Sequence, residues 1–130
     1  MWPGEKYSGE SMENLNNSSE VVRFCYFDDC SLFLGDLETD GQALMFEVLN
    51  QKNINTMSKY LKVAHHGSSN GTNQALLDYV KSSEAIISAG EDNQFGHPHG
   101  SIIDLLLGNN IEIKRTDKEG DIKVNFDGSK

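Results

Sequence analysis

The stretch Tyr60-Leu61-Lys62-Val63-Ala64-His65-His66-Gly67-Ser68 joins a short apolar run to two adjacent histidines. Such a run predicts a buried β-strand, and the glycine and serine that follow predict a sharp turn. The pattern therefore places two imidazoles where a strand leaves a sheet, and such an edge holds ligands rigidly. An earlier apolar run, 31–34, is followed by Gly35-Asp36, so a carboxylate is expected at a strand end as well.

Strands and helices are expected to alternate along the rest of the chain. Strands are predicted over 21–27, 31–34, 60–64, 85–88, 111–115 and 122–126. Helices are predicted over 38–51, 74–80 and 101–107, the last capped by Ser101. The first two strands and the last two would each form a hairpin. This order predicts the α/β class, with a mixed sheet flanked by helices.

The composition is that of one globular domain. The chain has 130 residues, of which 37% are hydrophobic. Residues 1–20 are polar and without periodicity and are expected to form an N-terminal arm, followed by a domain over 21–130. The apolar stretches are too short for a membrane segment, and the N-terminus lacks a signal-peptide pattern, so a cytoplasmic location is expected.

Charge and cysteine content narrow the functional classes. The net charge of −9 argues against extensive non-specific binding to nucleic-acid phosphates, because such binding depends on Lys and Arg. Cys25 and Cys30 lack the Cys-x-x-Cys spacing of zinc-ribbon and thioredoxin sites. Two reduced thiols are expected, with a disulfide across the turn as the alternative.

Each polar candidate has a structural and a functional interpretation. Asp36 can be a turn or capping residue, or a carboxylate that bridges metal ions. His65 and His66 can be surface loop residues, or one can bind a metal while the other faces a different part of a pocket. His97 lies in the long loop 89–100 before Pro98 and can be a binding group or a solvated loop residue. Arg115 can close the second hairpin or reach an anionic ligand.

Five segments together resemble one family. They are Asn16-Asn17-Ser18-Ser19, Phe33-Leu34-Gly35-Asp36-Leu37-Glu38, Leu61-Lys62-Val63-Ala64-His65-His66-Gly67-Ser68, Phe95-Gly96-His97-Pro98 and Arg115-Thr116-Asp117. Their order is similar to that in the metallo-β-lactamase-fold domain of the ComEC DNA-internalisation competence proteins and their soluble relatives. The resemblance extends from about Trp2 to Gly128 and implies a four-layer αββα hydrolase with two divalent metal ions, zinc or manganese.

The resemblance also implies roles for individual residues. Asp36 matches the metal-bridging aspartate, and His66 is favoured as a metal ligand. His65 is favoured as a residue that supports a metal ligand or contacts a substrate phosphate, and His97 matches a loop histidine that lines the same pocket. Both are candidate catalytic residues that would stabilise phosphoryl oxygens or protonate a leaving group. Ser19 matches an Asn-x-x-Ser element near a further ligand position.

One departure from the family limits these expectations. No histidine precedes His65, so the family's His-x-His-x-Asp-His motif is missing. The chain therefore resembles the C-terminal half of the domain, and we expect phosphodiesterase or nuclease-like chemistry in the complete site and no activity from the chain alone. The alternatives are a non-catalytic half that serves as a binding or structural partner, and a domain that binds one metal ion. The half-domain interpretation predicts an exposed apolar sheet face that packs against the missing half or a second copy.

Overall fold

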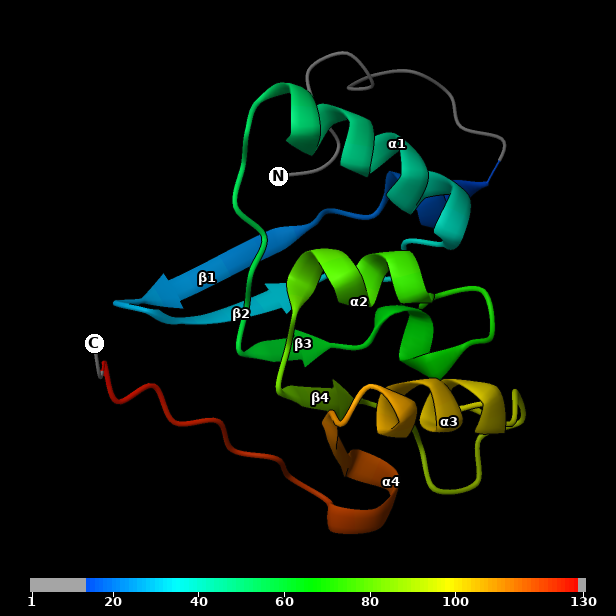
Figure 1. Ribbon diagram of the computed structural model, residues 1–130. Coiled ribbons are helices and arrows are strands. Elements are labelled where there is room, and N and C mark those ends of the chain that lie inside the picture. Colours follow the sequence, from blue (N-terminus) through cyan, green and yellow to red (C-terminus); the bar gives the residue numbers. More distant parts are fainter. Residues whose placement is uncertain (1–13, 129–130) are drawn as a thin grey trace.

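The computed structural model describes residues 14–128, which contain one five-stranded sheet (Figure 1). The strands, in sheet order, are β1 (Val22–Tyr26), β2 (Asp29–Phe33), β3 (Tyr60–Lys62), β4 (Glu84–Ile87) and β5 (Glu112–Arg115). β1 pairs with β2 in antiparallel orientation, and β2 to β5 are parallel. The predicted α/β class and mixed sheet are confirmed.

Helices connect the parallel strands. The α-helices are α1 (Thr39–Gln51), α2 (Gln74–Val80), α3 (Gly100–Gly108) and α4 (Thr116–Glu119), and the 3-10 helices are η1 (Leu15–Ser18) and η2 (Ala64–Gly67). α1, α2 and α3 each follow a parallel strand, and such crossovers place helices against a sheet face. No helix within residues 14–128 is long and apolar enough to cross a membrane.

The main core lies between one sheet face and these helices. Leu32, Leu61 and Ile87 on the strands are fully buried, as are Met45 on α1 and Leu106 on α3. Burying one such side chain contributes about 1.5–3 kcal/mol. The core therefore holds the strand ends, and with them the loops that follow, in fixed positions.

The opposite sheet face is only partly covered. Val22, Phe24 and Phe33 are 46 to 53% exposed there, next to Tyr60 and Ile86. We call the sheet face that these five residues share the open face, although Tyr60 itself is buried. The exposed apolar surface expected from the sequence is thus present.

The C-terminal segment 121–128 runs along this face toward the β1–β2 turn (Figure 1). The Phe126 ring lies 5.4 Å from the Phe24 ring and 5.5 Å from the Tyr60 ring, and the Tyr60 hydroxyl donates to the Asn125 carbonyl. The predicted second hairpin is therefore wrong. β5 joins β4 as a parallel strand and leads into α4, and the alternation of Ile122, Val124 and Phe126 packs this segment on the sheet without strand pairing.

Two further expectations are corrected. Ser101 is not a cap, because α3 begins at Gly100 with His99 at the N-cap position and no side-chain cap. The end of the expected polar arm contains η1, so the prediction of a loop is wrong for residues 15–18, while residues 1–13 lie outside the described part.

Cys25 and Cys30 form a disulfide instead of the expected free thiols. They are direct partners in the antiparallel register of β1 and β2, with Cα atoms 4.1 Å apart. Hairpin pairing brings the two sulfurs together across a two-residue turn. A search for Cys-x-x-Cys spacing cannot detect this arrangement.

Candidate functional site

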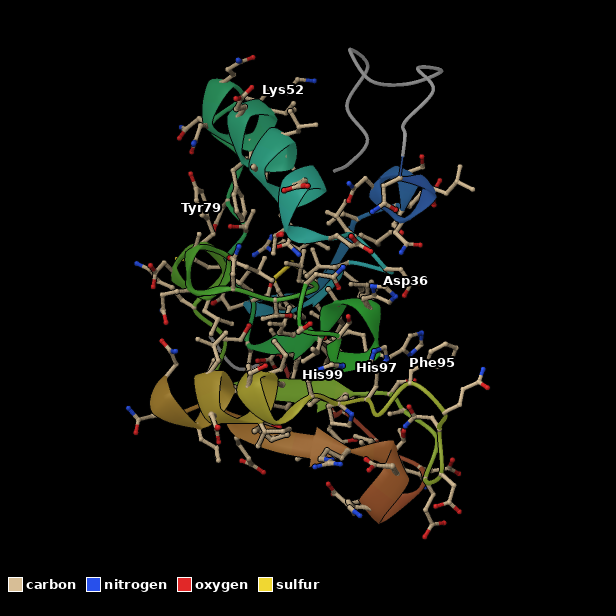
Figure 2. All side chains as sticks on the ribbon, turned by 90° about the vertical axis from the view of Figure 1, so that its right-hand side faces the viewer. Asp36, Lys52, Tyr79, Phe95, His97 and His99 are labelled. Atoms are coloured by element: carbon tan, nitrogen blue, oxygen red, sulfur yellow. A yellow bond between two sulfur atoms is a disulfide. The ribbon has the colours of Figure 1, made fainter. Side chains whose placement is uncertain are left out.

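The loops that follow β2, β3 and β4 meet at one end of the sheet and enclose a pocket. Figure 2 shows Asp36, Phe95 and His97 on this side of the molecule. The pocket has a volume of about 390 Å³ and is lined by Asp36, His65, His66, Ala89, Gly90, Asn93, Phe95 and His97. The structure therefore brings together all four residues that the sequence singled out for metal binding or catalysis.

The two adjacent histidines lie in a strained turn and not at the strand exit itself. β3 ends at Lys62, and His65 and His66 have left-handed backbone conformations with φ of 47° and 55°. Such conformations cost of the order of 1–3 kcal/mol for residues with a side chain and concentrate at functional sites. The His65 amide donates to the Gly35 carbonyl over 3.0 Å, which fixes this turn against the Asp36 loop.

His66 turns its Nε2 atom toward Asp36. Its Nδ1 lies 2.7 Å from the Ser88 carbonyl oxygen, which only accepts, so Nδ1 carries the proton in the neutral ring. Nε2 then directs its lone pair toward Asp36 Oδ1, 3.5 Å away. A second proton on the ring or a cation between the two atoms is needed to make this contact favourable.

The separation suits a metal ion. Two ligand atoms bonded to zinc at about 2.1 Å with a tetrahedral angle are about 3.4 Å apart. His66 Nε2 and Asp36 Oδ1 fit that geometry as two donors. Residues 14–128 contain no group of three or more His, Cys, Asp or Glu side chains that could hold a metal. In the described part, these two side chains therefore form a pair and not a complete ligand set.

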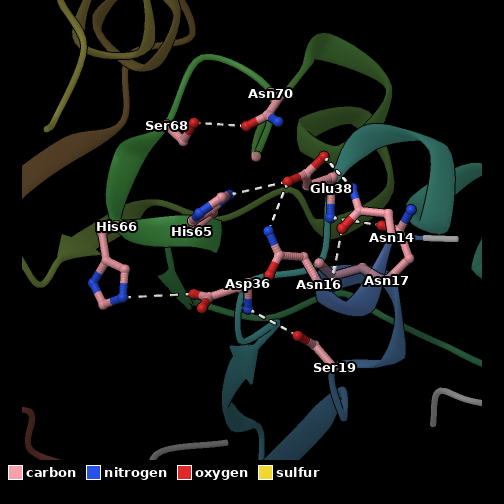
Figure 3. Close-up of polar contacts among 12 residues, drawn as sticks. Asn14, Asn16, Asn17, Ser19, Asp36, Glu38, His65, His66, Ser68 and Asn70 are labelled. Atoms are coloured by element: carbon pink, nitrogen blue, oxygen red, sulfur yellow. Dashed lines mark hydrogen bonds and ion pairs between the residues drawn. The ribbon is translucent and has the colours of Figure 1, made fainter. Parts of the chain in front are cut away.

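His65 belongs to a separate network around Glu38 (Figure 3). Its Nδ1 is buried, has no hydrogen bond, and lies 3.5 Å from Glu38 Oε1. The Glu38 carboxylate accepts from the side-chain amides of Asn14 and Asn16, each over 2.8 Å. A carboxylate held in this way favours the Nδ1–H form of the imidazole and fixes the ring orientation.

The segment before β1 also supports Asp36. Ser19 Oγ accepts from the Asp36 amide over 3.1 Å, and Asn17 Oδ1 accepts from the Glu38 amide. Gly35, with φ of +57°, passes so close to Ser19 that an added Cβ would lie 3.0 Å from the serine Cβ. The Asn-x-x-Ser element thus lies beside the candidate site as a support for its backbone.

Asn93 holds the loop that carries His97. Its side chain donates to the His97 carbonyl over 2.6 Å and accepts from the His97 amide over 2.9 Å. The His99 amide donates to the Gly67 carbonyl, which ties this loop to the histidine turn. Burial lowers the pKa of His97, and nearby His99 lowers it further, so His97 is neutral at neutral pH.

Arg115 does not line the pocket. Its guanidinium donates to both carboxylate oxygens of Asp117, over 3.0 and 2.6 Å, and this pairing lowers the pKa of Asp117. Thr116 Oγ1 donates to the Ala89 carbonyl and accepts from the Ala89 amide. The Arg115-Thr116-Asp117 segment therefore anchors β5 and the pocket loop instead of closing a hairpin or contacting a ligand there.

Sequence reasoning missed the residues that position the site. Glu38, Asn93 and Ser88 act through contacts with residues distant in the chain, or through the backbone. The local signal for this network is the group of asparagines at positions 14, 16 and 17.

Comparison with known proteins gives two relatives. ComE operon protein 3 of Bacillus subtilis is 34% identical over 111 residues, which cover 85% of this chain and 14% of that protein. Recombination protein 2 of Haemophilus influenzae is 32% identical over 130 residues, which cover 96% of this chain and 16% of that protein. Both proteins are homologues of this chain. The chain spans less than a fifth of the length of either relative, and no protein-family model matches it.

Proposed function

We propose that the chain is one half of a metal-dependent phosphodiester hydrolase that acts on DNA during its uptake. The observation that carries this proposal is the pair formed by His66 Nε2 and Asp36 Oδ1, two lone-pair donors 3.5 Å apart in a pocket. The homology to two much longer proteins is consistent with a domain whose remaining ligands come from additional chain.

The role in DNA uptake comes from the resemblance to the ComEC competence proteins. The relationship to ComE operon protein 3, at 34% identity over most of this chain, supports that resemblance. The metallo-β-lactamase architecture is part of the proposal. In it, a second sheet packs on the open face and brings the His-x-His-x-Asp-His motif to the pocket.

His66 and Asp36 would hold the metal, zinc or manganese, since imidazole and carboxylate ligands suit both ions. The metal would supply Lewis acidity toward a phosphoryl oxygen and lower the pKa of water. His65, oriented by Glu38 through Nδ1, would donate a hydrogen bond from Nε2 to a phosphoryl oxygen when both ring nitrogens carry a proton. His97, neutral at neutral pH, would accept a proton or pass one toward the leaving group.

A second candidate function is a non-catalytic half that serves as a binding or structural partner. This function is favoured by the small number of metal donors that lie together in residues 14–128. Two donors are fewer than the three or four protein ligands of typical zinc sites. The exposed aromatic residues of the open face would then provide the contact surface.

The experiment that separates the two functions is reconstitution. The chain is co-expressed with a segment of a relative that carries His-x-His-x-Asp-His, and cleavage of a generic phosphodiester is measured with zinc or manganese. We expect cleavage by the pair of chains, none by this chain alone, and loss of cleavage in Asp36→Ala. A stable but inactive complex that binds no metal would support the non-catalytic function instead.

A further inference from the structure

Phe95 is the exposed aromatic residue at the rim of the candidate site. Its side chain lines the same pocket as Asp36 and His66, yet the residue is 67% exposed. A ring with this much open surface loses contact with water only when something packs on it. Its position beside the pocket suggests that the packing partner is part of the ligand.

The ring is held in place by its own loop. The Phe95 ring lies against the His97 ring, at an interplanar angle of 27° and a centroid distance of 5.8 Å. His97 is fixed in turn by the two hydrogen bonds to Asn93. His97 therefore supports the Phe95 side chain, and most of the surface of Phe95 remains exposed to solvent.

The charge of the chain limits what else could hold a nucleic acid. The net charge is −9, and no Lys or Arg of residues 14–128 lines this pocket. Attraction to the phosphate backbone, the usual source of nucleic-acid affinity, is therefore weak here. Stacking of a base on an aromatic ring needs no charge and changes affinity by about 5- to 150-fold per base.

We propose that Phe95 is a stacking platform for an unpaired nucleobase of the substrate, next to the phosphoester that the site receives. This inference rests on the proposed phosphodiester function and narrows its substrate to base-bearing, single-stranded nucleic acid. Only an unpaired base offers a free face to the ring.

The test uses the fluorescence of tryptophan placed at this position. Phe95→Trp is made in a Trp2→Phe background, and a short single-stranded thymidine oligonucleotide is titrated at physiological ionic strength, where repulsion between charges is screened beyond about 8 Å. We expect quenching by this oligonucleotide and none by a strand of equal length whose bases are replaced by abasic sites. The matched control is Phe27→Trp, which is also exposed but lies at the β1–β2 turn at the other end of β2.

Binding to the otherwise unchanged chain provides the second measurement. Phe95→Ala should weaken binding of the thymidine strand by about 5- to 150-fold and leave binding of the abasic strand unchanged, whereas Phe27→Ala should change neither. Equal binding of both strands by the unchanged chain, or quenching by both, overturns the platform and leaves the phosphoester site intact. Binding of neither strand also overturns the platform, and Phe95 would then be a contact for another protein segment. The proposed function is tested separately, by the reconstitution of the two halves.

Discussion

His65 and His66 are neighbours in sequence but have separate partners. His66 faces Asp36 and is fixed by the Ser88 carbonyl, whereas His65 is paired with Glu38. The left-handed backbone of the turn directs the two rings to different partners. The different roles of the two histidines therefore do not come from the alternation of side chains along a strand.

The first prediction concerns metal content in the reconstituted pair of chains. His66→Ala should lose metal, because it removes one of the two donors. His65→Ala should keep the metal and lose about 10- to 100-fold in rate, the range typical of groups around a metal site. Elemental analysis of both variants decides the assignment. If His65→Ala is the variant without metal, the assignment is reversed. If both variants retain metal, neither histidine is a metal ligand.

At the scale of elements, the two pocket loops depend on a close approach between Gly67 and Pro98. Gly67 has φ of +83°, and a Cβ there would lie 2.5 Å from Pro98 Cβ and 3.0 Å from its Cα. Gly96 also has positive φ, at +67°, but a Cβ there would meet nothing within 4 Å. Alanine substitutions at these two glycines therefore distinguish the cost of backbone strain alone from the cost of strain plus steric contact.

Gly67→Ala should therefore destabilise the chain by more than about 2 kcal/mol and displace the loop of His97. Gly96→Ala should cost about 1 kcal/mol, the strain of the left-handed region alone. Urea denaturation of both variants measures the difference. Equal losses would show that the contact with Pro98 is relieved without cost.

The ion pair at the end of β5 predicts a pH dependence of stability. Arg115 lowers the pKa of Asp117 below its ordinary value of 3.8, so the pair stabilises the folded chain above that pH and loses its effect as pH falls through the lowered value. Asp117→Asn should cost about 1–2 kcal/mol at pH 7. Thermal denaturation should show the difference between the two proteins shrinking once the pH falls below 3.8, and a difference that stays constant throughout the acid range would exclude this origin.

The elements that could be predicted are those with local signals. The apolar spacing of α1 and α2 and the first hairpin were found because their patterns reflect burial on one side. Segment 122–126 shows the limit, since its alternation fits both a paired strand and a segment laid on a sheet. In the site, Asp36 and the histidines were detectable as residue types, but Glu38 and Asn93 depend on contacts that only the fold creates.

At the scale of the whole molecule, one sheet face is covered by helices and the other by a single segment. Phe24 and Phe33 remain about half exposed on the open face. Contiguous apolar surface of this kind favours association. We therefore expect the chain to self-associate when no complementary half is present.

Phe33→Asp should reduce this association severalfold and lower the binding of a hydrophobic dye. Leu107→Asp, on α3, alters an equally exposed apolar residue and should change neither property. Sedimentation at several concentrations provides the measurement. A strictly monomeric, dye-free native chain would mean that segment 121–128 closes the open face sufficiently.

The disulfide between Cys25 and Cys30 bears on cell biology as well as on the fold. It closes a very short loop within one hairpin, so it can form as soon as that hairpin emerges from a ribosome or a translocation channel, before the parallel strands assemble. Glutathione and thioredoxin keep thiols reduced in the cytosol. A chain retained there, as its sequence led us to expect, meets a redox environment that removes this cross-link, whereas an exported chain keeps it.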